Sequence, residues 1–213
     1  MNPGPVFHAG TFHAICDQLA KKDRDLRQIL DAYGYPPLWS REPGFETLLR
    51  IILEQQVSLA SANAAFGKLQ AAIGSVQPGK ILLLSDQELK ACSFSRQKTG
   101  YARNLAAAVC SGDLKIAELC TLSDTGIRNE LKKIKGIGDW TAAVYMMLSL
   151  HRSDLFPSGD LALVKSIREV KKLDASVPAD TLAVLVESWK PYRTIAAYLL
   201  WHQYLSRRGI RTG

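Results

Sequence analysis

Two glycines separated by one apolar residue, Gly136-Ile137-Gly138, lie between two stretches of helical periodicity and could bind a phosphate group. Glycine tolerates backbone conformations that other residues avoid, so this segment can form a tight hairpin with exposed backbone amides, with Ile137 tucked between the helices. The amides would lie at the N-terminus of the helix that begins near Asp139, where the helix dipole is positive. An ordinary helix C-cap followed by a turn fits the same residues, so both interpretations stay open.

Basic residues precede the hairpin, and the whole chain is basic. Lys132, Lys133 and Lys135 come directly before the first glycine. The chain has 27 Lys and Arg residues against 20 Asp and Glu residues, which gives a formal net charge of +7. A basic protein attracts acidic polymers, and nucleic acid is the first candidate.

Other classes of protein are disfavoured by what the sequence lacks. The four cysteines and four histidines have none of the spacings typical of zinc or iron–sulfur ligands, so we expect no metal held by side chains. The cysteines Cys16, Cys92, Cys110 and Cys120 are expected to be buried thiols in a reducing compartment. No apolar stretch approaches the ~20 residues of a membrane span, and no signal-peptide pattern is present, so we expect a cytoplasmic protein in a prokaryote or a nuclear one in a eukaryote.

The elements that must position these residues are helices. Apolar residues recur at spacings of three and four, without sustained alternation, which predicts an all-α fold. Gly34 and the prolines after it end an early helix, and a linker follows through Pro43. The predicted helices cover 11–20 and 23–33, begin at Phe45 and Ser58, cover 80–84, 86–92 and 95–110, extend over 123–135 and 160–170, and begin again near Pro178 and Pro191.

The motifs of this chain resemble, in order, those of the helix-hairpin-helix (HhH-GPD) DNA glycosylases, and within them the alkylbase or DNA-3-methyladenine glycosylase II branch. The similarity extends from Phe45 to Tyr204. The matching segments are Ile52-Leu53-Glu54-Gln55-Gln56-Val57-Ser58, Ser95-Arg96-Gln97-Lys98 with Tyr101, the hairpin, Phe156-Pro157-Ser158-Gly159-Asp160, and Trp189-Lys190-Pro191-Tyr192-Arg193 leading to Trp201.

The resemblance implies two helical domains with a substrate cleft between them. One would comprise residues 45–150 and hold the hairpin, and the other would be built from residues 1–44 and 151–213. It also implies a monomeric enzyme that excises alkylated purines, such as 3-methyladenine and 7-methylguanine, from double-stranded DNA during base excision repair. No cofactor is required, but hairpin carbonyls of the family can hold a monovalent cation, Na⁺ or K⁺.

The resemblance assigns the catalytic role to Asp160. Cleavage of an N-glycosidic bond passes through a positively charged sugar, which a carboxylate stabilises while it orients the attacking water. An N-cap aspartate is the alternative interpretation, and one side chain can serve both purposes. Glycosylases that also cut the backbone have a lysine two residues after the second glycine, where this chain has Trp140, so we expect a monofunctional enzyme without lyase activity.

Aromatic side chains would select the base, because alkylation makes it cationic. The family's pocket positions match Trp140 and Trp201, with Phe45 and Tyr192 as further candidates, and core packing is the alternative for each of them. Trp189, Tyr198 and Tyr204 are better explained as core residues. The remaining predicted DNA contacts are Gln55, Gln56, Ser58, Lys98, Lys135, Gly136, Ile137, Gly138 and Thr141.

In the family, the loop after the helix that begins at Phe45 fills the gap that a flipped nucleotide leaves. In this chain that loop is Gln55-Gln56-Val57-Ser58. Some relatives have a leucine there where this chain has Gln56, so the wedge residue is left open. Gln55 or Gln56 could bond the orphaned base, or both amides could lie on a solvated helix end. Arg96, Lys98 and Arg103 could face phosphates or serve solubility.

Other functions also fit part of the sequence. A non-catalytic helix-hairpin-helix protein would need the hairpin but neither Asp160 nor the aromatic pair. A glycosylase for oxidised or mismatched bases is disfavoured by Trp140 and by the missing cluster cysteines. A helical scaffold that binds no nucleic acid would leave the ordered motifs unexplained.

Overall fold

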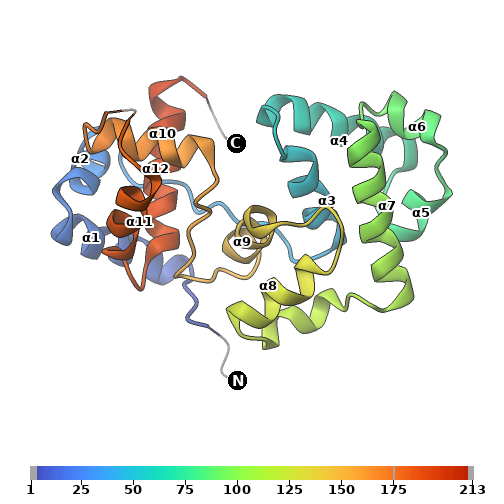
Figure 1. Ribbon diagram of the computed structural model, residues 1–213, viewed down its shortest axis with the longest axis horizontal. Helices are drawn as coiled ribbons and strands as arrows, with labels where there is room; N and C mark the ends of the chain where they lie inside the picture. Colours follow the sequence, from blue (N-terminus) through green and yellow to red (C-terminus); the bar gives the residue numbers. More distant parts are fainter. Residues whose placement is uncertain (1–3, 175, 211–213) are drawn as a thin grey trace. The chain divides into compact units, whose positions relative to one another are not determined.

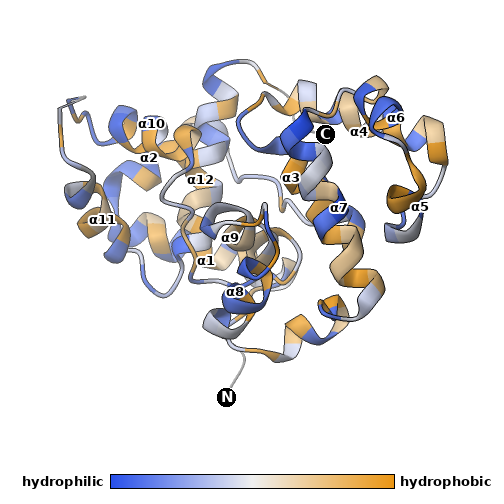
Figure 2. Ribbon diagram, turned by 45° about the vertical axis from the view of Figure 1, so that its right-hand side comes forward, coloured by the Kyte–Doolittle hydropathy of each residue, from blue (hydrophilic) through white to orange (hydrophobic). Residues whose placement is uncertain are grey.

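The computed structural model describes residues 4–174 and 176–210, and within them the fold is helical without β-strands (Figure 1). A single antiparallel bridge joins Val6 to Arg152. The all-α prediction is confirmed. None of the described helices is long and apolar enough to cross a membrane, and Figure 2 shows apolar and polar residues interspersed along helices such as α7.

The chain forms two compact units. The first, here called the hairpin unit, contains Arg41–Leu150, and the second, the terminal unit, contains Gly4–Ser40 and the chain from His151 onward. The boundaries expected from the sequence were 44/45 and 150/151, and those in the structure are 40/41 and 150/151.

The hairpin unit is organised around α3, which packs against α4, α7 and α9. Leu48, Leu49, Ile51 and Ile52 of α3 are completely buried, and α9 is buried from Thr141 onward. Helix α7 also packs against α5, and α8 against α9. The elements are α3 (Phe45–Glu54), α4 (Leu59–Ile73), α5 (Pro78–Leu83), α6 (Asp86–Ala91), α7 (Arg96–Ser111), the 3₁₀ helix η1 (Ile116–Thr121), α8 (Asp124–Lys132) and α9 (Asp139–Leu148).

The terminal unit joins the two ends of the chain, as the blue and orange-red helices of Figure 1 show. Helix α12 packs against α1, α2 and α10. Phe7, Phe12 and Tyr198 form its aromatic core, with ring centroids 5.7–5.9 Å apart. The helices are α1 (Ala9–Lys22), α2 (Arg24–Tyr33), α10 (Leu161–Val170), α11 (Ala179–Glu187) and α12 (Arg193–Arg207).

Side-chain caps fix several of the helix starts. Ser58, Ser95, Ser123 and Asp160 each accept a hydrogen bond from a backbone amide in the first turn of the following helix, as their residue types predict. The helix expected over 123–135 ends three residues early, at Lys132, because the hairpin turn begins there. The 3₁₀ helix was not expected.

The cysteines only partly match the expectation of buried thiols. Cys16 and Cys92 are buried, and burial raises the pKa of Cys16 to about 12. Cys110 and Cys120 are exposed, so that expectation was wrong for these two. Cys110 lies in the last turn of α7 and Cys120 on the short η1, where the apolar neighbours Leu114 and Leu119 take the buried positions instead. No group of three or more potential metal ligands occurs among the described side chains.

Candidate functional site

The hairpin between α8 and α9 is a tight turn closed by its own backbone. The Ile134 amide donates to the Leu131 carbonyl at 3.1 Å, and the Ile137 amide donates to the Ile134 carbonyl at 3.0 Å. Ile137 is only 5% exposed, so its side chain is packed into the unit as predicted. The turn therefore places the N-terminus of α9 directly after Gly138.

Gly136 is required by the fold. Its φ is +107°, a backbone conformation that residues other than glycine rarely adopt. A Cβ built there would lie 2.3 Å from Cγ of Tyr101. The Tyr101 ring thus packs against the bare backbone of the hairpin. Any substitution at position 136 must displace that ring or the turn.

Gly138 is not required by the fold in the same way. It has an extended backbone, with φ −102° and ψ −172°, and a Cβ there would have no atom within 4 Å. As the N-cap of α9 it offers no side-chain hydrogen bond, whereas α4, α7, α8 and α10 all have one. The first turn of α9 therefore presents amides and a positive dipole end without a side-chain cap, which suits an anion.

Most basic side chains around the hairpin are paired with carboxylates, and Lys135 is not. Asp139 accepts from Arg128 at 3.0 Å and from Lys132 at 2.8 Å, and these hydrogen bonds lower the pKa of its carboxyl. Lys133 is paired with Glu130 at 2.8 Å. Lys135 is exposed, and its ammonium group has no partner among the described residues. Of the three lysines before the hairpin, Lys135 is the one left to meet an external anion.

Gln55 holds the hairpin in place. Its Nε2 donates to the Gly136 carbonyl at 2.9 Å and to Thr141 Oγ1 at 2.8 Å, which joins the end of α3 to the turn and to α9. Thr141 is 1% exposed. Gln55 and Thr141 were both predicted to contact DNA. In the structure their side chains support the hairpin backbone, which is itself a predicted DNA contact.

Gln56 is the exposed residue at the tip of the α3–α4 turn. Its φ of +57° is unusual for a non-glycine residue, and the exposed Val57 follows it. Ser58 is occupied as the cap of α4, accepting from the Ser61 amide at 3.2 Å. A contact of Gln56 with DNA stays a prediction.

Two residues predicted to contact phosphates have internal partners. Lys98 Nζ donates to the Leu53 carbonyl at 2.6 Å, near the end of α3, and burial lowers the pKa of this lysine. Arg103 pairs with Asp86 at 2.6 Å and donates to the Leu84 carbonyl at 2.8 Å. The sequence could not reveal these roles, because each joins segments distant along the chain.

Asp160 caps α10 in the terminal unit. Its Oδ1 accepts from the Leu163 amide at 3.0 Å, and its own amide donates to the Pro157 carbonyl at 2.8 Å. The side chain is partly exposed, and the next residue, Leu161, is 75% exposed. The carboxylate is therefore held at the helix start, in a residue that is partly exposed to solvent.

The predicted pocket aromatics divide between exposed and core positions. Trp140 is partly exposed in the first turn of α9, whereas Phe45 is only 8% exposed and lies in the core of the hairpin unit. Tyr192, at the start of α12, and Trp201 are partly exposed. Trp189 and Tyr198 are buried, as the core interpretation predicted. The partly exposed Tyr204 instead lies against Arg208, with the guanidinium 3.8 Å from its ring centroid.

Trp39 is a neighbour of Trp201 that the sequence did not single out. The two ring centroids are 6.2 Å apart, and the Tyr198 hydroxyl donates to the Trp39 carbonyl at 2.8 Å. The only sequence signal was a tryptophan in the irregular segment after Pro36 and Pro37.

The scan of known families finds a match over residues 49–191 to the HhH-GPD superfamily of base excision DNA repair proteins. The chain belongs to this family. Fission yeast DNA-3-methyladenine glycosylase 1 is 31% identical over 191 residues, which are 86% of this chain and 83% of that protein. The structure of fission yeast 3-methyladenine DNA glycosylase bound to abasic DNA superposes with a TM-score of 0.81 at 28% identity, covering 88% of this chain and 95% of that one.

Bacterial members of the HhH-GPD family are similarly related. A Bacillus halodurans DNA-3-methyladenine glycosidase has a TM-score of 0.72 at 29% identity, covering 92% of this chain and 91% of that one. Bacillus subtilis YfjP is 29% identical over 184 residues, 83% of this chain, and the chain spans only 64% of its length.

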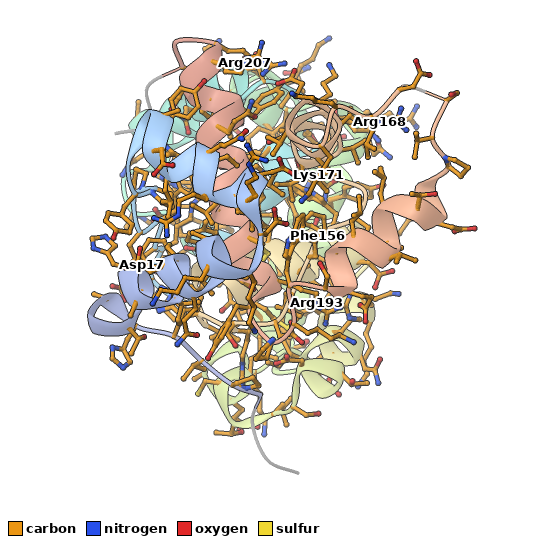
Figure 3. The ribbon with its side chains drawn as sticks, turned by 90° about the vertical axis from the view of Figure 1, so that its left-hand side faces the viewer. Asp17, Phe156, Arg168, Lys171, Arg193 and Arg207 are labelled. Carbon is orange, nitrogen blue, oxygen red and sulfur yellow. The ribbon has the colours of Figure 1, made fainter. Side chains whose placement is uncertain are left out.

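In this HhH-GPD protein the terminal unit is braced by partly buried ion pairs. Lys171 contacts Asp23 at 2.7 Å, and Arg193 contacts Asp154 at 2.8 Å; Figure 3 shows Lys171 beside the blue helices. Burial raises the pKa of Asp23, but hydrogen bonds from Lys171 and from the Trp189 indole outweigh it, so the pKa lies below its usual value. These pairs tie α10 and α12, which carry Asp160 and Trp201, to the rest of the unit.

Proposed function

We propose that this protein is a DNA glycosylase that excises alkylated purines from double-stranded DNA in base excision repair. The observation that carries the proposal is a partly exposed aspartate, Asp160, capping α10 in a chain similar over 88% of its length to a 3-methyladenine glycosylase bound to DNA. The relatives' names supply the substrate class, and the hairpin supplies a site for the DNA backbone.

Two parts of the chain would carry out the reaction: the hairpin would bind the DNA backbone, and Asp160 would act on the sugar. Amides at the N-terminus of α9 would hold a phosphate, with Gln55 and Gly136 fixing the turn. The damaged nucleotide must rotate out of the duplex at a cost of a few kcal/mol. Asp160 would then stabilise the positive charge that develops on the sugar and orient a water molecule for attack.

Alkylation at N3 or N7 makes the base both cationic and a good leaving group, so aromatic faces suffice for selection. Stacking and cation–π contacts contribute about 1–3 kcal/mol each. Trp140, Trp201 and Tyr192 are the partly exposed candidates, and Phe45 is disfavoured by its burial.

The test of the proposal measures the release of free base from alkylated duplex DNA together with strand breaks before and after hot alkali. Base release with breaks only after alkali supports it. Tight, salt-sensitive DNA binding without release of any alkylated base would instead make the protein a non-catalytic DNA binder.

We further propose that the enzyme hydrolyses the glycosidic bond without cutting the backbone, because Trp140 stands where a lyase would need a lysine. Borohydride added during the reaction is expected to trap no covalent protein–DNA adduct. A bifunctional glycosylase assayed in parallel is the positive control, and a trapped adduct with this protein would show that another amine attacks the sugar.

We also propose that hairpin carbonyls hold Na⁺ or K⁺. The Ile134 and Gly136 carbonyls each accept one hydrogen bond, which leaves each oxygen a second lone pair for a cation. Replacing K⁺ and Na⁺ with tetramethylammonium at constant ionic strength is expected to weaken DNA binding, and unchanged affinity would contradict the cation. The monomeric state and the location, cytoplasmic in a prokaryote or nuclear in a eukaryote, stay predictions.

A further inference from the structure

A surface hollow of about 610 Å³ lies along α7 in the hairpin unit. We call it the α7 hollow. Its α7 residues recur at helical spacing, so they share one face of the helix, and one hairpin residue completes the lining. The lining residues are Arg96, Gln97, Gly100, Tyr101, Asn104 and Lys135.

The two basic side chains that line the α7 hollow are not neutralised by any other residue of the described chain. Its lining has Arg96 and Lys135 but no acidic side chain. Neither cation has a hydrogen bond or an ion pair with a described residue. Among the other basic side chains of the hairpin unit, Lys90 alone shares this property; the rest bond to carboxylates, hydroxyls or carbonyls.

Polar groups that can donate to an anion complete the lining. Gln97 Nε2 donates to the Tyr101 hydroxyl at 2.7 Å, so the hydroxyl's own proton is directed elsewhere and can be donated. Asn104 Nδ2 lies 3.4 Å from the Lys135 carbonyl, which connects α7 to the hairpin. The Tyr101 ring also supports Gly136, so the hollow and the hairpin form one continuous surface.

Gly100 keeps the hollow open at a cost to the helix. A glycine inside a helix is about 0.5–1 kcal/mol less favourable than alanine. A Cβ at Gly100 would have no atom within 4 Å, so packing does not demand a glycine there. The missing side chain instead leaves room in the hollow for a ligand.

We propose that the α7 hollow binds a phosphodiester group of the DNA, other than the phosphate held at the N-terminus of α9. Two unneutralised cations and a hydroxyl donor match a phosphate. No residue of α9 lines the hollow, so the two contacts are separate. A polyanion can contact both sites, because Lys135 lines the hollow and directly precedes the hairpin glycines. This inference rests on the proposed function for its choice of DNA.

The first test measures how the Kd for duplex DNA depends on salt in the full chain. Each phosphate contact contributes about 0.9 to the slope of log K against log salt. Arg96→Gln and Lys135→Gln are each expected to reduce the slope, and the double variant is expected to reduce it by about that amount. Lys90→Gln, the same loss of charge at an unpaired cation of α6 outside the hollow, is expected to leave it unchanged.

The second test places an acidic side chain in the hollow. Gly100→Glu is expected to raise the Kd by about tenfold or more, because like charges repel. Gly67→Glu is the matched control, since Gly67 is also a helical glycine with open space around its Cβ but lies in α4. Neither change should lower the Tm, because glutamate is the better helix former.

Equal slopes for the three glutamine variants, or equal Kd values for the two glutamate variants, would overturn the proposal. Base release by the wild type in either of those cases would leave the glycosylase function standing. Conversely, the expected slopes from a protein that releases no base would support the hollow and overturn the proposed function.

Discussion

Replacing Asp160 with asparagine is expected to slow base release from alkylated duplex DNA by about a hundredfold or more. Asparagine is as good an N-cap as aspartate, so the hydrogen bond to the Leu163 amide survives and α10 should keep its start. What is lost is the negative charge that would stabilise the sugar cation. DNA affinity should change little, because a carboxylate contributes nothing favourable to phosphate binding.

The measurement is a single-turnover assay of free base, with Tm and DNA Kd determined for the same preparation. Asp180→Asn is a suitable control, because it removes the same charge from the first turn of α11 in the same unit. A normal rate of base release by Asp160→Asn with an unchanged Tm would mean that Asp160 serves only as a helix cap. A slow rate in the control as well would point to the unit's overall charge rather than to this carboxylate.

Asp160 also shows what the sequence can and cannot predict. Helix caps are local, and Ser58, Ser95, Ser123 and Asp160 all cap the helices expected after them. The periodicity of apolar residues likewise places most helices within a few residues, since each is decided by its own segment.

Roles that depend on distant partners could not be predicted. Gln55 bonds to Gly136, 81 residues away, and Lys98 bonds to Leu53, 45 residues away. Both residue types are typical of DNA-facing surfaces, and nothing in their own segments distinguishes a support for a helix end from a ligand for a phosphate. Phe45 is similar, because an aromatic residue at a helix start suits a pocket and a core equally well.

Substitutions of the two hairpin glycines are expected to have opposite effects. A change at Gly136 should lower the stability of the fold, whereas a change at Gly138 should weaken DNA binding without lowering stability. Gly136→Ala forces a Cβ against the Tyr101 ring at a positive φ. Backbone strain of about 1–3 kcal/mol and overpacking of a similar size should lower the free energy of unfolding by roughly 2–6 kcal/mol. The Tm should fall by several degrees, and the loss should be smaller in a Tyr101→Ala background, because the two shortest contacts, with Cγ and Cδ1 of the ring, are then removed.

Gly138→Ser should keep or raise the Tm while it weakens DNA binding. The extended backbone of Gly138 is the conformation that an N-cap serine adopts, and a Cβ there has open space, so the hydroxyl can accept from an amide in the first turn of α9. That hydroxyl competes with a phosphate for the same amide. Since hydrogen bonds to charged groups contribute about 1.5–3 kcal/mol, the Kd for DNA should rise about 10- to 100-fold. A stable Gly138→Ser protein with wild-type affinity would mean that the phosphate is held elsewhere, and that Gly138 merely allows the chain to pass from α8 to α9.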